Sequence, residues 1–170
     1  HGHLKAITPP DPARTRTRVL TGEQLGTAEA DWATGLTARL LSENPPPARP
    51  AFLHNDLHAG NLMVTDDGAV TALIDWGDAG WGDPALDLSY SGPLAVPDLL
   101  AGYHEATGRP DDALTLRVLA YTLDNAARYL TRQPEAHENG DLWYTRPATA
   151  LMQLLRVSPR VPQWLEVLGR

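Results

Sequence analysis

The chain has 170 residues, enough for one domain with a core of its own, and its 42% apolar and 21% charged residues are ordinary for a globular protein. It contains no cysteine, which excludes disulfides, thiolate metal sites and a cysteine nucleophile. The net charge of −7 argues against a nucleic-acid partner, and no apolar run reaches the roughly 18–20 residues that cross a membrane. Because the start lacks both Met and the pattern of a signal peptide, we expect a truncated form of a cytoplasmic protein.

The charges are unevenly distributed along the chain. No Lys or Arg occurs between Pro50 and Gly108, whereas that stretch holds nine acidic residues. An anionic ligand bound there needs a metal ion or another domain to supply positive charge. The plainer interpretation is a solvated acidic surface.

The first two predicted elements differ in regularity. Residues 8–18 contain three prolines and then alternate Arg with Thr, which predicts an irregular, exposed arm. Residues 27–43 place apolar side chains at the spacing of an amphipathic helix. These apolar residues are Ala28, Trp32, Leu36, Leu40 and Leu41.

The middle of the chain predicts a small amount of β-structure, and the rest predicts helices. Residues 51–53 are typical of a short buried strand, and residues 62–64 and 70–74 flank an Asp-Asp-Gly turn that predicts a hairpin. Asp83 and Pro84 are typical of a helix start, with the helix running through Leu88. Three longer helices are predicted, over residues 97–107, 111–132 and 138–157. The expected fold class is mainly α with a small β-hairpin (α+β).

Two segments carry groups suited to one kind of chemistry. The first has a carboxylate and a carboxamide five residues apart, in His54-Asn55-Asp56-Leu57-His58-Ala59-Gly60-Asn61. The second has another carboxylate after the hairpin, in Ile74-Asp75-Trp76-Gly77. The hairpin folds the chain back, so Asp75 returns to the loop that holds Asp56 and Asn61. Phosphoryl transfer needs such a set: one carboxylate orients the attacking hydroxyl, and the other oxygen ligands hold Mg²⁺.

These residues resemble those of a known family. The spacing His-x-Asp, four residues, Asn and then Asp-x-Gly is that of protein kinases, with Trp76 in place of Phe. The resemblance to the aminoglycoside phosphotransferase and choline kinase superfamily is closer. It rests on Asp-Leu-His-x-Gly-Asn, followed by Ile-Asp-Trp-Gly and by Gly-Asp-Pro-Ala-Leu-Asp-Leu at residues 82–88. Protein kinases usually carry Lys at the position of His58. The resemblance implies that residues 27–170 form the C-terminal lobe of a protein-kinase-like fold.

The resemblance also implies a role for each matching residue. Asp56 is similar to the catalytic base, and Asn61 and Asp75 are similar to the Mg²⁺ ligands, with ATP or GTP as the phosphoryl donor. Four further residues are expected to support the loop: His54, His58, Asp83 and Asp87. Residues 1–26 are expected to hold the irregular arm and, at residues 2–7, the tail of a helix.

The family pattern implies a partner and leaves the substrate open. The N-terminal lobe that grips ATP has no counterpart here, because the only lysine is Lys5 and no glycine-rich loop precedes His54. We therefore expect the isolated chain to have little kinase activity. An acidic lobe favours a cationic, aminoglycoside-like substrate by long-range attraction, while choline, homoserine and sugars remain alternatives. The helices after Pro93 are expected to set specificity, but they carry no recognisable signature.

Two other classes of function compete with a kinase. The first is a zinc hydrolase, because zinc ligands on a strand alternate as do His54, Asp56 and His58. No additional His or Cys cluster accompanies them. A non-catalytic, kinase-like scaffold is the second alternative. Against it, all three groups that the chemistry requires are present.

Overall fold

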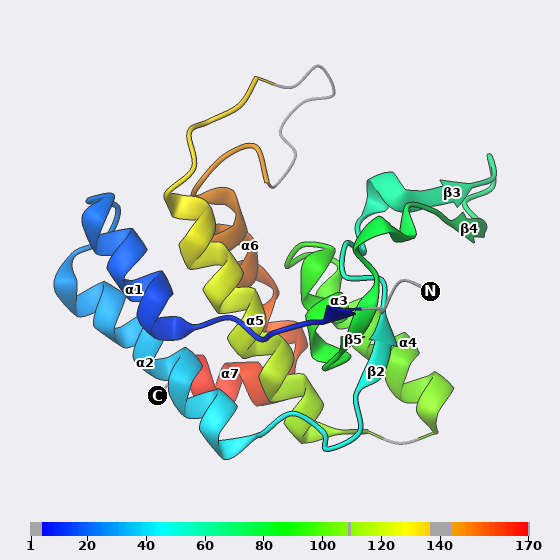
Figure 1. Cartoon of the computed structure of the whole chain (residues 1–170), viewed down its shortest axis with the longest axis horizontal. Helices are drawn as coiled ribbons and strands as arrows, with labels where there is room; N and C mark the ends of the chain where they lie inside the picture. Colours follow the sequence, from blue (N-terminus) through cyan, green and yellow to red (C-terminus); the bar gives the residue numbers. More distant parts are fainter. Residues whose placement is uncertain (1–4, 109, 137–143, 170) are drawn as a thin grey trace.

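Helix α5 (Asp112–Leu130) lies at the centre of the helical part of the molecule. The computed structural model describes residues 5–108, 110–136 and 144–169. Five helices pack against α5, and Figure 1 shows them around it: α1 (Pro12–Thr21), α2 (Thr27–Glu43), α3 (Ala85–Tyr90), α6 (Thr149–Val157) and α7 (Pro162–Leu168). Helix α4 (Val96–Thr107) packs against α3, and a 3₁₀ turn, η3 (Ser158–Arg160), joins α6 to α7.

The main core forms where α5 meets its neighbours. Val118, Leu119 and Tyr121 of α5 are fully buried, together with Trp164 of α7. The indole N–H of Trp164 donates to the carbonyl oxygen of Thr115 at 3.0 Å, so its polar atom is satisfied inside the core. Each large apolar side chain buried in this way stabilises the fold by about 1.5–3 kcal/mol. Within the described ranges, no helix combines the length and apolarity needed to cross a bilayer.

The β-structure consists of two small sheets. Strand β5 (Gly80–Gly82) lies between β1 (Lys5–Ala6), which runs parallel to it, and β2 (Ala51–Leu53), which runs antiparallel. Strands β3 (Leu62–Val64) and β4 (Val70–Leu73) form the predicted hairpin, with a register irregularity between Met63 and Val64. Figure 1 shows this hairpin at the end of the molecule opposite α1 and α2. The fold is therefore mainly helical with small sheets, as the sequence predicts for the C-terminal lobe of a kinase-like fold.

The prediction of an irregular arm over residues 8–18 holds for residues 8–11 and is wrong from residue 12 onward. Helix α1 begins at Pro12, and the Asp11 carboxylate caps it by accepting from the backbone N–H of Ala13 at 3.0 Å. Proline at the first helical position needs no hydrogen bond and has a suitable φ, so it starts this helix. Thr15 and Val19, four residues apart, form the buried face of α1.

Two other predictions about the chain's ends need correction. Lys5 and Ala6 form strand β1 and not the tail of a helix, and residues 1–4 lie outside the described residues. The predicted helix over residues 138–157 is helical only from Thr149, because residues 144–148 form turns that include Pro147, and proline interrupts helical hydrogen bonding. The segment 137–143 of that prediction lies outside the described residues.

The face of α2 also differs from the prediction. The helix spans Thr27–Glu43 as expected, but Trp32 is 52% exposed and Ala28 is exposed too. The buried side is built largely from small residues, among them Ala30 and Ala33, which let α2 approach α1 and α5 closely. Of the large apolar residues predicted for that face, Leu36 and Leu40 are buried and Trp32 is not.

Candidate functional site

The loop that follows β2 is fixed at its first two residues by a carboxylate from another element. Asp87, in the first turn of α3, accepts from the backbone N–H of His54 at 2.8 Å and from that of Asn55 at 2.7 Å, using one carboxylate oxygen for each. Hydrogen bonds to an ionised acceptor are among the stronger ones in proteins. Asn55 has a φ of 62°, in the left-handed region that non-glycine residues rarely adopt. Asp87 thus holds the loop in a tight turn directly before Asp56.

Asp56 and Asn61 are in contact across this loop. The Asn61 side-chain N–H₂ donates to the Asp56 backbone carbonyl at 2.9 Å and to Oδ2 of its carboxylate at 3.2 Å. Asn61 is buried at 7% exposure, whereas the Asp56 side chain is 31% exposed and open to an incoming group. Because Nδ2 makes both contacts with Asp56, the Oδ1 oxygen of Asn61 is left as an available metal ligand.

His58 lies beside the Asp56 carboxylate. Its Nδ1 accepts from the backbone N–H of Gly60 at 3.0 Å and caps the 3₁₀ turn η1 (Ala59–Asn61). An accepting Nδ1 puts the proton of the neutral ring on Nε2, which lies 3.5 Å from Asp56 Oδ2. A Cβ at position 60 would lie 2.9 Å from Cε1 of the His58 ring, so a larger residue there would displace this ring.

The hairpin brings Asp75 back to Asn61. The backbone N–H of Ile74 donates to the Asn61 carbonyl at 2.9 Å, which extends the β3–β4 ladder to the residue before Asp75. Asp75 has a φ of 61° and starts the 3₁₀ turn η2 (Trp76–Asp78). Its side chain is exposed and makes no hydrogen bond or ion pair within the described part of the chain. Asn55 and Asp75, two of three non-glycine residues with positive φ among those described, therefore both border this site.

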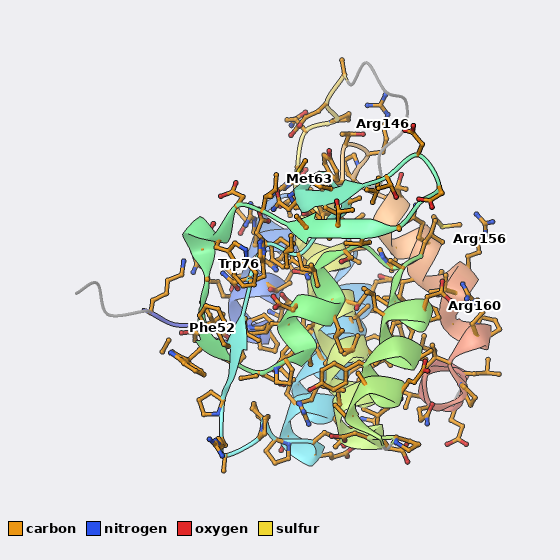
Figure 2. All side chains as sticks on the ribbon, turned by 90° about the vertical axis from the view of Figure 1, so that its right-hand side faces the viewer. Phe52, Met63, Trp76, Arg146, Arg156 and Arg160 are labelled. Atoms are coloured by element: carbon orange, nitrogen blue, oxygen red, sulfur yellow. The ribbon has the colours of Figure 1, made fainter. Side chains whose placement is uncertain are left out.

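His54 and three aromatic rings support the loop and the hairpin from one side. The Nε2 of His54, which is buried, lies 2.8 Å from the Ile74 carbonyl oxygen, and its ring lies edge-on to Trp76 with centroids 4.7 Å apart. Phe52 stacks on Trp76 at 5.8 Å and meets Trp81 edge-on at 5.5 Å. Figure 2 shows Phe52 and Trp76 on the same side of the molecule, next to β2.

Asp83 is part of a buried network one layer below the site. Its Oδ2 accepts from Nε of Arg117 at 2.8 Å and from the Tyr121 hydroxyl at 2.9 Å, and its Oδ1 accepts from the backbone N–H of Ala85. Burial, together with the adjacent Asp83 charge, raises the pKa of Tyr121, so the hydroxyl stays a donor. This network fixes the start of α3, and therefore the position of Asp87, against α5.

The profile of the phosphotransferase enzyme family matches residues 5–127. The chain belongs to this family. The match spans the loop, the hairpin and Asp87, as well as most of α5, so the contacts described above lie within the family's common region.

Individual relatives of this chain match over shorter stretches. A protein of Bacillus subtilis strain 168 named "Uncharacterized protein YcbJ" is 31% identical over 101 residues, 55% of this chain and 33% of that protein. Thiamine kinases of Shigella boydii serotype 4 and Escherichia coli K12 are 43% identical over 58 residues, 34% of this chain and 20% of each kinase. The chain thus covers a third or less of the relatives' length.

The arrangement does not favour the zinc alternative. His54 and His58 each use a ring nitrogen to hold the backbone, at Ile74 and Gly60 respectively. Among the residues that the structure describes, no group of three or more His, Asp or Glu is placed to hold a metal ion. A site with one carboxylate and one amide oxygen suits Mg²⁺ instead, since Mg²⁺ commonly takes one or two protein ligands plus phosphate oxygens.

A cavity next to the loop contains residues that sequence reasoning left unassigned. It has a volume of about 480 Å³, reaches Asn55, and lies between the segment at residues 7–18 and helices α3 and α5. Four arginines line this cavity and a smaller one that adjoins it: Arg14, Arg18, Arg128 and Arg132. The sequence offered one signal for this cluster: arginines occur on both sides of residues 51–108, which contain no Lys or Arg.

Proposed function

We propose that the protein containing this chain transfers the γ-phosphoryl group of ATP or GTP to a hydroxyl of a small molecule, with Mg²⁺. The observation that supports the proposal is that Asn61 links the loop that holds Asp56 to the end of the hairpin that precedes Asp75. Asn61 contacts the Asp56 carboxylate through its side chain and the residue before Asp75 through its backbone. The family match supports the same class of reaction.

In the proposed step, Asp56 orients the attacking hydroxyl by accepting its hydrogen bond. The hydroxyl oxygen forms a bond to the γ-phosphorus, while the bond from that phosphorus to the β–γ bridging oxygen breaks. The hydroxyl proton passes to the Asp56 carboxylate and then to solvent, leaving a nucleoside diphosphate and a phosphate monoester. Positioning and charge stabilisation supply most of the acceleration in this chemistry.

The remaining residues of the loop hold the reacting groups in place. Oδ1 of Asn61 and the carboxylate of Asp75 would hold Mg²⁺, which neutralises charge on the nucleotide phosphates when bound. Residues 51–108 contain no Lys or Arg that could do so. His58, with its Nε2 proton facing Asp56, helps to fix the base, and Asp87 and His54 fix the loop and the hairpin.

The substrate class follows less directly. The acidic lobe favours an aminoglycoside-like polycation by long-range attraction, and choline, homoserine and sugar kinases remain alternatives within the same superfamily. The thiamine kinases among the relatives support a small-molecule substrate. A non-catalytic scaffold is the second candidate function, and it predicts that loss of Asp56 has no effect.

Replacing Asp56 by Asn in the full-length protein tests the proposal. We expect turnover to fall roughly 10²–10⁴-fold, because the variant keeps the size of the side chain but loses the base. The matched control is Asp66→Asn, which changes an exposed carboxylate in the hairpin turn and should leave turnover unchanged. The measurement is product phosphorylation across a substrate screen. Equal turnover of wild type and Asp56→Asn, with both folded, would contradict the role of Asp56 as the base. A scaffold would give no product in either form and would keep its biological activity in Asp56→Asn.

A further inference from the structure

Two adjoining cavities lie between α1, α3 and α5, directly beside the proposed catalytic loop. The larger, of about 480 Å³, is in the size range of small-molecule sites, and the smaller has about 90 Å³. Arg18, Tyr90, Asn125 and Arg128 line both, so the two cavities lie side by side. The larger cavity reaches Asn55, the residue before Asp56.

The smaller cavity is strongly cationic. Three arginines, Arg18, Arg128 and Arg132, line it, and none of its lining residues is acidic. This contrasts with the chain's net charge of −7 and with the absence of Lys and Arg from residues 51–108. The cluster is therefore a local feature, opposite in sign to the rest of the lobe.

Two of the three guanidinium groups are held in place by the protein. Nε of Arg128 donates at 2.9 Å to Oδ2 of the buried Asp124, whose other oxygen accepts from the Thr15 hydroxyl at 2.6 Å. The Arg132 guanidinium lies over the Tyr129 ring, 4.3 Å from its centroid. Arg18 has no carboxylate within ion-pair distance in the described ranges, so its charge is not offset there.

The Asp56 charge affects the pKa of two tyrosines that line the smaller cavity. Burial raises the pKa of both Tyr90 and Tyr129, and the Asp56 charge adds to the rise in each case. Both tyrosines line the smaller cavity. The adjoining larger cavity reaches Asn55, so this space lies beside the residue that precedes Asp56.

We propose that the substrate is an anionic hydroxyl compound, whose carboxylate or phosphate group is bound by Arg18, Arg128 and Arg132 while its hydroxyl reaches Asp56. Guanidinium groups suit both anions, because their paired N–H donors match two oxygens at once. A polycation would place its amines against three arginines, so the cavity disfavours the aminoglycoside-like substrate that the net charge suggests. The inference rests on the proposed function, since it names the substrate class of the same site.

The first test measures binding to this chain, with glucose and three of its derivatives as probes. Calorimetry would compare gluconate and glucose 6-phosphate, which carry the two candidate anions, with neutral glucose and cationic glucosamine. We expect one or both anions to bind more tightly than the neutral and cationic sugars, and the preferred anion identifies the group. Equal binding of all four, or binding of glucosamine alone, overturns the proposal.

Variants then locate the binding. The double variant Arg18→Gln, Arg132→Gln should weaken binding of the preferred anion roughly 10- to 100-fold, because it removes two charged donors. Arg39→Gln is the matched control, since Arg39 is an exposed arginine of α2 that lines neither cavity and, in the described ranges, forms an ion pair with Glu43 on the same helix. Unchanged anion binding in the double variant would overturn the assignment to this cavity.

Turnover of the full-length protein separates this inference from the proposed function. In the double variant we expect a higher KM for the anionic substrate and an unchanged KM for ATP. A raised KM for ATP alone would assign the arginines to the nucleotide and overturn the proposal. Phosphorylation of cationic substrates alone would also overturn the anionic-substrate proposal, but it would leave the kinase proposal intact. Anion binding without any turnover would contradict the kinase function alone.

Discussion

Asp87 joins two segments that are 33 residues apart by giving one oxygen to each of two backbone N–H groups. In Asp87→Asn one of these oxygens becomes an N–H₂ group, which faces a donor instead of accepting from it. We expect the free energy of unfolding to fall by about 1–3 kcal/mol, measured by urea denaturation. Asp98→Asn is the control, because the exposed Asp98–Arg160 pair should contribute less than about 1 kcal/mol. An equal effect of the two variants would contradict the role given to Asp87.

Asp124 makes stability depend on pH. Burial raises the pKa of its carboxyl above the ordinary 3.8, although the Thr15 hydroxyl and Arg128 both act to lower it. The folded chain then holds this proton more tightly than the unfolded chain, so stability contributed by Asp124 is complete below the ordinary pKa and is lost as pH rises through the folded one. Measured against Asp124→Asn, the wild-type free energy of unfolding should decline from about pH 4 upward. A difference that stays constant from pH 3.5 to about 7 would be inconsistent with this account.

The residues of the proposed site differ in how readily sequence identifies them. Asp56, Asn61 and Asp75 were found from their spacing, because the loop and the hairpin are local structures that the chain forms with its own neighbours. The bond between Asp83 and Arg117 spans 34 residues and depends on how α3 packs against α5. A single sequence contains no signal for such a pair, and Arg117 alone is typical of an exposed helix face.

At the scale of elements, strand β1 depends on glycines in β5. A Cβ at Gly80 would lie 2.7 Å from Cδ1 of Ile7 and would also meet the Lys5 carbonyl, so Gly80→Ala should separate β1 from β5. We expect a loss of about 1–3 kcal/mol in the free energy of unfolding, as for other overpacked sites.

Gly102→Ala provides the control for this prediction. Gly102 lies within α4, and a Cβ there meets nothing within 4 Å, so alanine should stabilise the chain by roughly 0.5–1 kcal/mol. Thermal unfolding of both variants measures the two effects. Stabilisation by Gly80→Ala would show that β1 does not pack on β5 as described.

Elements with strong local signals were predicted well, and those set by tertiary contacts were not. The bounds of α2 and of the β3–β4 hairpin follow from apolar periodicity and from an Asp-Gly turn. Helix α1 was missed because its prolines suggested a break, whereas Pro12 starts the helix. Strand β1 has two residues and pairs with a strand more than 70 positions away, so periodicity cannot reveal it.

At the scale of the whole molecule, the division of labour between lobes leads to a prediction about activity. This chain holds the proposed base and metal ligands, but its only lysine, Lys5, pairs with Asp78 at 2.8 Å. We propose that a preceding nucleotide-binding lobe supplies the grip on ATP. A phosphotransfer assay should therefore give little or no turnover for residues 1–170 and much more for a form extended at the N-terminus. Equal rates would contradict the need for a second lobe.

The rings packed around Trp76 make its fluorescence a reporter of the proposed site. Trp76 follows Asp75 directly, is 47% exposed, and is in contact with both Phe52 and His54. The fluorescence of an indole depends on its exposure and on neighbouring rings, so any rearrangement of Asp75 alters the emission of Trp76. The difference in emission between the wild-type chain and Trp76→Phe is therefore a built-in signal for ligand binding near Asp75, readable by titration without a coupled assay or an attached dye.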